Sequence, residues 1–162
     1  MTWRRICCPV DFSWESRVAL RGAAELVHRF GGELTLLHVD DRMRPPHTDE
    51  TLGAPTEASE VDPGTVELDR ALASWRDDAE RITRTAVDYA LVAGAPAREI
   101  TRFAREGGFD AIVMGTHGQG GRELWPLGSV AQAVARDATC TVIIVRGEQG
   151  ERSRAEPAWG EA

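Results

Sequence analysis

The sequence predicts an α/β fold in which an open sheet of five parallel strands carries helices on both faces. Five short apolar runs alternate along the chain with four segments whose apolar residues recur at helical spacing. The apolar runs are nearly continuous, as expected for parallel strands that are buried on both faces. Glycines gather between the fourth run and the last helical segment, a position where such sheets commonly hold their ligands.

The first two strands and the first helix are predicted from the opening of the chain. Residues 6–10 form an apolar strand, and Asp11 follows at its carboxyl end. Ser13 is the expected N-cap of a helix whose apolar residues share one face and which ends at the glycine pair 31–32. Residues 33–39 form the second predicted strand.

An irregular segment over residues 42–64 follows the second strand. It carries four prolines, several acidic residues and few apolar residues. A loop of this length inside a compact domain is usually disordered or functional. We expect disorder. The alternative is a lid over a ligand, because the segment leaves the carboxyl end of a strand on the same side as the glycines.

The remaining elements are predicted from the same two patterns, continuous apolar runs for strands and apolar residues at helical spacing for helices. In chain order they are a helix over 66–84, a strand over 85–92, a helix over 97–106, a strand over 109–114, a helix over 129–136 and a strand over 139–145. Pro96 suits the first turn of its helix, and Ser129 is the expected N-cap of the last helix. We expect one domain over residues 1–147 and a disordered, charged tail over 148–162.

Length and charge narrow the class of protein. A chain of 162 residues suits a single domain with one core. The net charge of −7 makes nucleic acid an unexpected partner, because an acidic field repels phosphate backbones. No apolar run reaches the length of a membrane span, and the first residues do not resemble a signal peptide. We therefore expect a cytoplasmic protein without a membrane partner.

Two residue types exclude further chemistry. All 19 basic residues are arginine, which excludes the lysine of a Walker A loop and lysine Schiff-base catalysis. The three cysteines, Cys7, Cys8 and Cys140, fall in predicted strands without a CxxC motif or clustered histidines. They predict core packing, with no metal site and no disulfide framework.

The glycines after the fourth predicted strand form a spaced motif. The spacing is Gly115-x2-Gly118-x9-Gly128-Ser129. Glycine allows a positive φ and lets ligand oxygens approach the backbone, and the N-terminal end of the following helix attracts an anion. This spacing resembles the nucleotide-binding signature of the ATP-binding branch of the universal stress protein family.

The resemblance covers nearly the whole chain, from residue 6 to residue 145. The string Asp-x-Ser-x2-Ser-x2-Ala that begins at Asp11 also resembles the opening of these proteins. The resemblance implies a Rossmann-like, adenine nucleotide-binding fold with strand order 3-2-1-4-5. In that order Asp11 and Gly115 meet at the switch point between strands 1 and 4, where open α/β sheets bind ligands.

The resemblance also implies a set of ligand-binding residues. They are Pro9, Val10, Asp11, Val39, Met114, Gly115, Gly118, Gly128, Ser129 and Val130. The amides of the last three would hold phosphates, Asp11 would contact the nucleoside, and the backbone of Val39 would read the adenine edge. Each also has a structural alternative: helix capping for Asp11 and Ser129, a plain turn for the glycines, and core packing for the apolar residues.

Other residues near the motif keep two interpretations. His117 either contacts phosphate or acts as an acid or base, or it is an exposed loop residue. Arg122 and Arg136 either pair with phosphate or lie on the solvated surface. Trp125, in a stretch that departs from the family, either reshapes the phosphate end or packs against a partner chain.

The resemblance implies ligand-dependent signalling or protection under stress. We do not expect catalysis, because no nucleophile–base pair and no metal cluster stands out. Mg²⁺ could accompany ATP through its phosphate oxygens. The alternatives are a slow ATPase or other phosphoanhydride hydrolase, and a dimeric partner module that binds no nucleotide. The resemblance implies a homodimer through the last strand, with Val142, Ile143, Ile144 and Val145 at the interface; an apolar edge strand also tends to pair.

Overall fold

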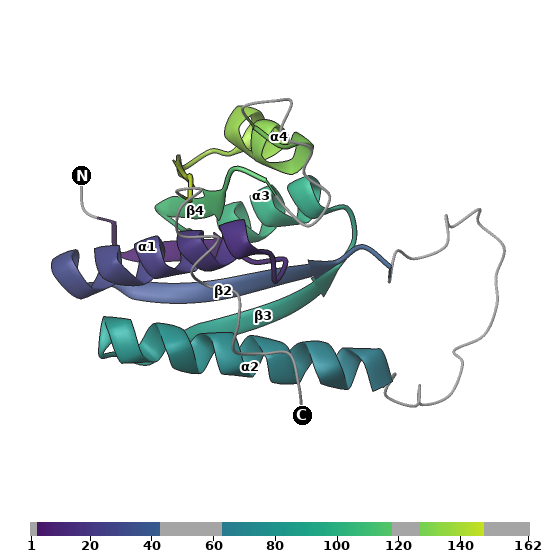
Figure 1. The fold of residues 1–162 in the computed structure, drawn as a ribbon. Coiled ribbons are helices and arrows are strands. Elements are labelled where there is room, and N and C mark those ends of the chain that lie inside the picture. The colour runs from purple at the N-terminus through teal and green to yellow at the C-terminus, as the bar shows by residue number, and fades with distance from the viewer. Residues whose placement is uncertain (1–2, 43–62, 118–126, 148–162) are drawn as a thin grey trace, which may run out of the picture.

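The computed structural model describes residues 3–42, 63–117 and 127–147. These residues form five strands and four helices (Figure 1). In chain order they are β1 (Arg5–Pro9), α1 (Trp14–Phe30), β2 (Glu33–Asp40), α2 (Pro63–Thr83), β3 (Asp88–Ala93), α3 (Pro96–Glu106), β4 (Ala111–Gly115), α4 (Ser129–Asp137) and β5 (Thr141–Val145). All neighbouring strands are parallel, and the order is β3-β2-β1-β4-β5. The expected fold class and strand order are confirmed.

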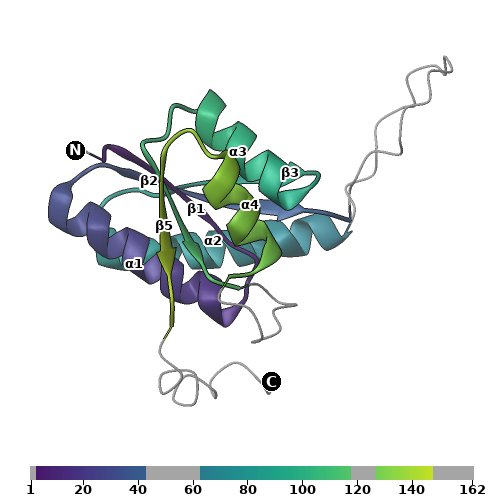
Figure 2. The same ribbon diagram turned by 90° about the horizontal axis from the view of Figure 1, so that it is seen from above.

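The sheet separates two apolar cores. One lies under α1 and α2, and the other lies under α3 and α4, which cover the near face of the sheet in Figure 2. Consecutive residues of β1 serve opposite cores: Cys8 packs on the α1/α2 side and Cys7 on the α3/α4 side. Both side chains are fully buried, and burial raises the pKa of the Cys8 thiol to about 12. Their predicted role in the core is confirmed. Cys140 is partly buried and packs against the second core, as expected, but its predicted place in a strand is wrong because β5 begins at Thr141.

One of the two largest boundary errors concerns the start of β3; the other is the start of α2. The predicted strand begins at residue 85, whereas β3 begins at Asp88. A turn occupies the difference: Arg84 has a left-handed backbone (φ 62°), and the Thr83 hydroxyl donates to the C=O of Thr85 (2.9 Å). The N–H of Val87 donates to the Glu80 carboxylate (3.0 Å). Side-chain hydrogen bonds thus hold these residues in a turn although their apolar pattern suits a strand.

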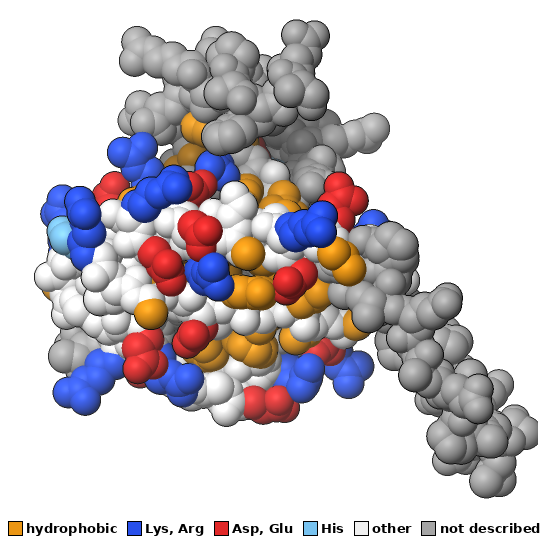
Figure 3. Space-filling model, turned by 90° about the horizontal axis from the view of Figure 1, so that it is seen from below, with side chains coloured by type: hydrophobic (Ala, Val, Ile, Leu, Met, Phe, Trp, Pro, Cys, Tyr) orange, Lys and Arg blue, Asp and Glu red, His pale blue; other side chains and the backbone are white. Residues whose placement is uncertain are grey.

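Helix α2 begins at Pro63, within the segment 42–64 that was predicted to be irregular. The rest of that segment, apart from Arg42, and the tail over 148–162 lie outside the described residues. The α2 side of the molecule, seen in Figure 3, carries interspersed acidic and basic side chains. Among them, the Arg17 guanidinium of α1 lies 2.6 Å from the Asp78 carboxylate of α2. This pair joins the two helices that cover one face of the sheet.

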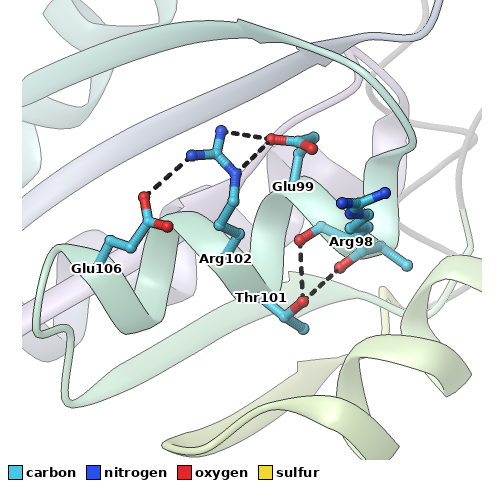
Figure 4. Close-up of polar contacts among 6 residues, drawn as sticks. Arg98, Glu99, Thr101, Arg102 and Glu106 are labelled. Atoms are coloured by element: carbon cyan, nitrogen blue, oxygen red, sulfur yellow. Dashed lines mark hydrogen bonds and ion pairs between the residues drawn. The ribbon is translucent and has the colours of Figure 1, made fainter. Parts of the chain in front are cut away.

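Helix α3 is tied along its length by one arginine. The Arg102 guanidinium donates to the carboxylates of Glu99 (2.9 Å) and Glu106 (3.0 Å), one turn away on either side (Figure 4). A Cβ at Gly94, whose φ is +142°, would lie 2.8 Å from the Cγ of Glu99. Glycine is therefore required at the turn that leads from β3 into α3.

Candidate functional site

A pocket of about 950 Å³ opens at the carboxyl ends of β1, β2 and β4. Its lining includes nine of the ten residues that the sequence suggested for the site: Pro9, Val10, Asp11, Val39, Met114, Gly115, Gly128, Ser129 and Val130. The tenth, Gly118, lies outside the described residues. Residues more than 100 positions apart in the chain thus share one cavity at the switch point of the sheet.

Helix α1 begins at the β1 wall of the pocket, and side chains of Asp11 and Ser13 cap its first turn. Ser13 is the N-cap of α1, as predicted, and its hydroxyl accepts a hydrogen bond from the N–H of Ser16 (3.1 Å). The Asp11 carboxylate accepts from the N–H of Ser13 (3.1 Å). The local capping role considered for Asp11 is therefore present in the structure. It occupies one carboxylate oxygen and leaves Asp11 in the lining of the pocket.

The β4 wall ends differently from the prediction. The N-cap of α4 is Gly128, and Ser129 is the first residue of the helix. Gly128 has an extended backbone (φ −69°, ψ 160°), and its N–H donates to the C=O of Thr116 (2.7 Å). Because glycine has no side-chain acceptor, the cap residue leaves the N–H groups of the first turn to other partners. Ser129 and Val130, in that turn, line the pocket.

The reason for glycine at two motif positions also needs correction. Gly115 and Gly128 do not have the positive φ that the sequence suggested. A Cβ at Gly115 would lie 2.9 Å from the backbone of Glu15, and a Cβ at Gly128 would lie 3.2 Å from the C=O of Thr116. Another part of the same chain passes close to both Cα atoms, so a Cβ at Gly115 would force the backbone to move and a Cβ at Gly128 would make a tight contact.

The β2 wall contributes an ion pair that sequence reasoning missed, between a buried carboxylate and a largely exposed arginine. Asp40 is 4% exposed, and its two carboxylate oxygens accept from the Arg42 guanidinium at 3.0 and 3.1 Å. The hydrogen bonds from Arg42 hold the pKa of the Asp40 carboxyl below its usual value. Both residues line the pocket. The available signal was position alone, since Asp40 directly follows the predicted strand 33–39.

Two aromatic side chains of the pocket were also missed. Phe12 and His38 line it, and their ring centroids lie 4.8 Å apart. The Nδ1 atom of His38 lies 2.7 Å from the C=O of Val10. Phe12 follows Asp11, and His38 precedes Val39, so both adjoin residues that were predicted for the site.

The residues that kept two interpretations differ in their distance from the pocket. His117 lines the pocket next to the cap of α4. Arg136 lies in the last turn of α4, at the far end of the helix from the pocket, and pairs with Asp137 (2.7 Å). Of the two interpretations given for Arg136, this position favours the solvated surface. Arg122 and Trp125 lie outside the described residues.

Two features of the described residues bear on the class of site. Within residues 3–42, 63–117 and 127–147, no group of three or more His, Cys, Asp or Glu residues is placed to hold a metal ion. No helix in the same ranges is long and apolar enough to cross a membrane. The described lining of the pocket offers backbone groups, hydroxyls, carboxylates, imidazoles and a guanidinium.

The fold and this pocket define an α/β protein with a ligand-sized cavity at its switch point, and comparison with known proteins identifies the family. A model of the universal stress protein family matches residues 2–146. The chain therefore belongs to the universal stress protein family.

The sequences of individual relatives match this chain over most of their length. Universal stress protein MJ0531 of Methanocaldococcus jannaschii is 29% identical over 157 residues, which cover 92% of this chain and 85% of the relative. The putative universal stress protein SH1215 of Staphylococcus haemolyticus is 31% identical over 151 residues, covering 92% of this chain and 88% of the relative.

Solved structures share the fold at lower sequence identity. The structure of MJ0577 has a TM-score of 0.74 and 24% identity, and the match covers 92% of this chain and 99% of that one. A universal stress protein in complex with cAMP has a TM-score of 0.68 and 21% identity, over 91% of this chain and 100% of that one. A universal stress protein from Archaeoglobus fulgidus in complex with dAMP has a TM-score of 0.62 and 23% identity, over 89% and 98%.

Proposed function

We propose that this universal stress protein binds an adenine nucleotide, ATP in the first instance, and acts in the cytoplasm as a ligand-dependent module of a stress response. The observation that carries the proposal is the start of α4, where Ser129 and Val130 present a helix N-terminus to a cavity that also contains Asp11 and Val39. The complexes of two structural relatives with cAMP and dAMP support an adenine nucleotide as the ligand class.

The proposed roles follow the chemistry of each wall. The N–H groups of Gly128, Ser129 and Val130, with the Ser129 hydroxyl, would hold phosphate oxygens at the positive end of α4. Gly115 and Gly118 would let the phosphates approach the backbone. Pro9, Val10 and Met114 would line the nucleoside part of the pocket. Mg²⁺ would accompany a triphosphate through its phosphate oxygens.

The carboxylates direct the other end of the ligand. Asp11 would accept hydrogen bonds from ribose hydroxyls, which are donors that phosphate groups lack. Asp40 is buried and ionised beside Arg42, so this arginine already has a carboxylate partner within the lining. We therefore place the phosphates toward α4 and the sugar toward β1, with the adenine edge at the peptide of Val39.

A charge reversal at the start of α4 tests the binding site. In Ser129→Glu an added carboxylate suits the helix dipole and should keep the fold, but it repels phosphate. We expect calorimetry to show ATP affinity falling by about a hundredfold, since two like charges near 4 Å cost a few kcal/mol at an intermediate dielectric. Ser129→Gln is the matched control and should lose at most about tenfold, from the missing hydroxyl. Unchanged ATP affinity in Ser129→Glu would place the phosphates elsewhere.

The alternatives have their own readouts. Mass analysis of small molecules released on denaturation identifies a ligand that copurifies, and its identity separates ATP from AMP and cyclic nucleotides. Phosphate release from ATP that disappears in His117→Ala or Asp11→Asn would support the slow hydrolase. A folded protein that neither retains nor takes up any adenine nucleotide would favour the dimeric partner module.

We also infer a homodimer through β5, which is an edge strand of the sheet. The N–H of Thr141 donates to the C=O of Asp110 beside β4 (3.2 Å), so odd-numbered residues of β5 direct their peptides inward. The peptides of Val142 and Ile144 therefore point outward and are available for pairing, with Ile143 and Val145 completing the apolar interface. Ile144→Pro removes an outward N–H and should give a monomer in sedimentation, whereas Ile144→Val should not. A wild-type protein that sediments as a monomer would contradict the inference.

A further inference from the structure

The neighbouring strands β1 and β2 separate just before Val39. The N–H of Val10 donates to the C=O of Leu37 (2.8 Å), so odd-numbered residues of β2 direct their peptide groups toward β1. The C=O of Asp40 accepts from the N–H of Gly94, so even-numbered residues face β3. The N–H and C=O of Val39 therefore point to the side of β1, in a position where β1 has already left the ladder.

A histidine takes the hydrogen-bond acceptor that would continue the ladder. In a regular parallel sheet the next bond would run from the N–H of Val39 to the C=O of Val10. That C=O instead lies 2.7 Å from Nδ1 of His38. Because a carbonyl oxygen only accepts hydrogen bonds, Nδ1 carries the proton and the imidazole is the donor. The side chain of His38 thus replaces the amide of Val39 on Val10.

The backbone of Phe12 and two aromatic rings hold the His38 imidazole in the position where it donates to Val10. Phe12 has a left-handed backbone (φ 62°), which is uncommon for a bulky residue and turns the chain away from β2. Its ring contacts the His38 ring at 4.8 Å and meets the edge of Trp75 of α2 at 5.3 Å. The imidazole is therefore held between the end of β1 and an aromatic side chain that α2 supports.

We propose that His38 is a positioning residue for nucleotide recognition: by binding the C=O of Val10, it keeps the peptide of Val39 open toward the pocket. The inference rests on the proposed function. A peptide offers a donor N–H and an acceptor C=O, which match the acceptor N1 and the donor N6 of adenine. Hypoxanthine carries a donor at N1 and an acceptor at O6, so it mismatches both groups. An open peptide at Val39 therefore selects adenine over hypoxanthine.

The binding test compares ATP with inosine triphosphate in two variants. His38→Leu removes the donor, whereas His38→Asn places an amide N–H₂ close to the former Nδ1 position. We expect ATP affinity to fall about tenfold in His38→Leu, the value of about one hydrogen bond, while the affinity for inosine triphosphate changes little. The ratio of the two affinities should return toward the wild-type value in His38→Asn. A wild-type ratio in a folded His38→Leu variant would overturn the proposal.

Hydrogen exchange of the Val39 amide, measured without nucleotide, tests the structural step alone. We expect exchange to slow by about tenfold in His38→Leu, because the amide can then pair with Val10, and to remain fast in the wild type and in His38→Asn. Unchanged exchange in His38→Leu would overturn the proposed competition. If no variant or wild-type protein binds ATP but exchange slows in His38→Leu, the proposed function and the role in base recognition fail while the competition itself stands.

Discussion

Two helices, α1 and α4, begin at the same pocket, and their N-termini are capped in different ways. At α1 the hydroxyl of Ser13 accepts from the N–H of Ser16, and the Asp11 carboxylate accepts from Ser13. At α4 the cap residue is Gly128, which has no side-chain acceptor. The first helix start is closed by its own residues and carries negative charge, whereas the second has no acceptor of this kind at its cap.

This difference shows which end of the pocket suits an anion. Both helices direct a positive dipole end at the cavity, so the dipole alone does not distinguish them. The carboxylate of Asp11 offsets that positive charge at α1, and the local hydroxyl takes an N–H that a phosphate would need. Helix termini at a pocket can therefore be ranked as anion sites by how completely their own residues cap them.

The largest expected effect comes from the contact that joins the two walls. In Gly115→Val the Cβ would lie 2.9 Å from the backbone of Glu15, so the first turn of α1 would have to move away from β4. We expect the free energy of unfolding in urea to fall by about 3 kcal/mol. Gly22→Ala is the control within α1: its Cβ would meet only Val145 at 3.6 Å, and it should gain up to about 1 kcal/mol. Equal stability of the two variants would contradict this.

The next variant gives α4 a cap like that of α1. Gly128→Ser adds a hydroxyl that accepts from the first turn of α4, while its Cβ meets the C=O of Thr116 at 3.2 Å. We expect ATP affinity to fall about tenfold in calorimetry, because the hydroxyl competes with phosphate for the N–H groups. Gly128→Ala introduces the same Cβ without the acceptor and should lose less. An equal loss in Gly128→Ala would show that the Cβ contact, and not the hydroxyl, weakens ATP binding.

The reciprocal variant opens the start of α1. Ser13→Ala removes the hydroxyl that caps the N–H of Ser16, and we expect the free energy of unfolding to fall by about 1 kcal/mol. Ser13→Asp retains a capping oxygen and should remain near the wild-type stability. Thermal and urea unfolding measure both changes. A stable Ser13→Ala protein would mean that the bond of Asp11 to residue 13 suffices to hold this turn.

The smallest effect is a pH dependence at the β2 wall. The pKa of Asp40 is lowered in the folded state, so its contribution is present above the pKa of the unfolded chain and is lost as pH falls through the folded value. Comparing urea unfolding at neutral pH and near pH 3 should therefore show a smaller acid loss in Asp40→Asn than in the wild type. A double variant with Arg42→Gln should add little to this difference. An unchanged acid loss in Asp40→Asn would mean that Arg42 does not stabilise the carboxylate.

Much of the fold could be predicted because it depends on local periodicity. The continuous apolar runs located all five strands, and the cap at Ser13 was predicted correctly from residue type. The same rule failed at Ser129, because the extended backbone and the bond of Gly128 to Thr116 decide where α4 begins. Residue type identifies good caps, but the path of the preceding loop selects the position that serves as one.

The pocket was predicted in part, because the ends of the strands could be located from local periodicity. Residues that end strands could be assigned to the carboxyl edge, and the nine described candidates do share one cavity. The roles of Phe12 and His38 were missed because they depend on the point at which β1 leaves β2. That point is set by contacts between three elements, since Phe12 also packs on Trp75 of α2, and no short sequence pattern encodes it.

The contact of Gly115 with Glu15 also bears on how a ligand would enter. The last residue of β4 lies against the first turn of α1 too closely for either to slide toward the other. The crevice therefore cannot narrow at this contact when a molecule binds, and this wall of the cleft is preorganised against closing. Association on this side would then require little ordering of the chain, and the corresponding entropic cost would already have been met in folding.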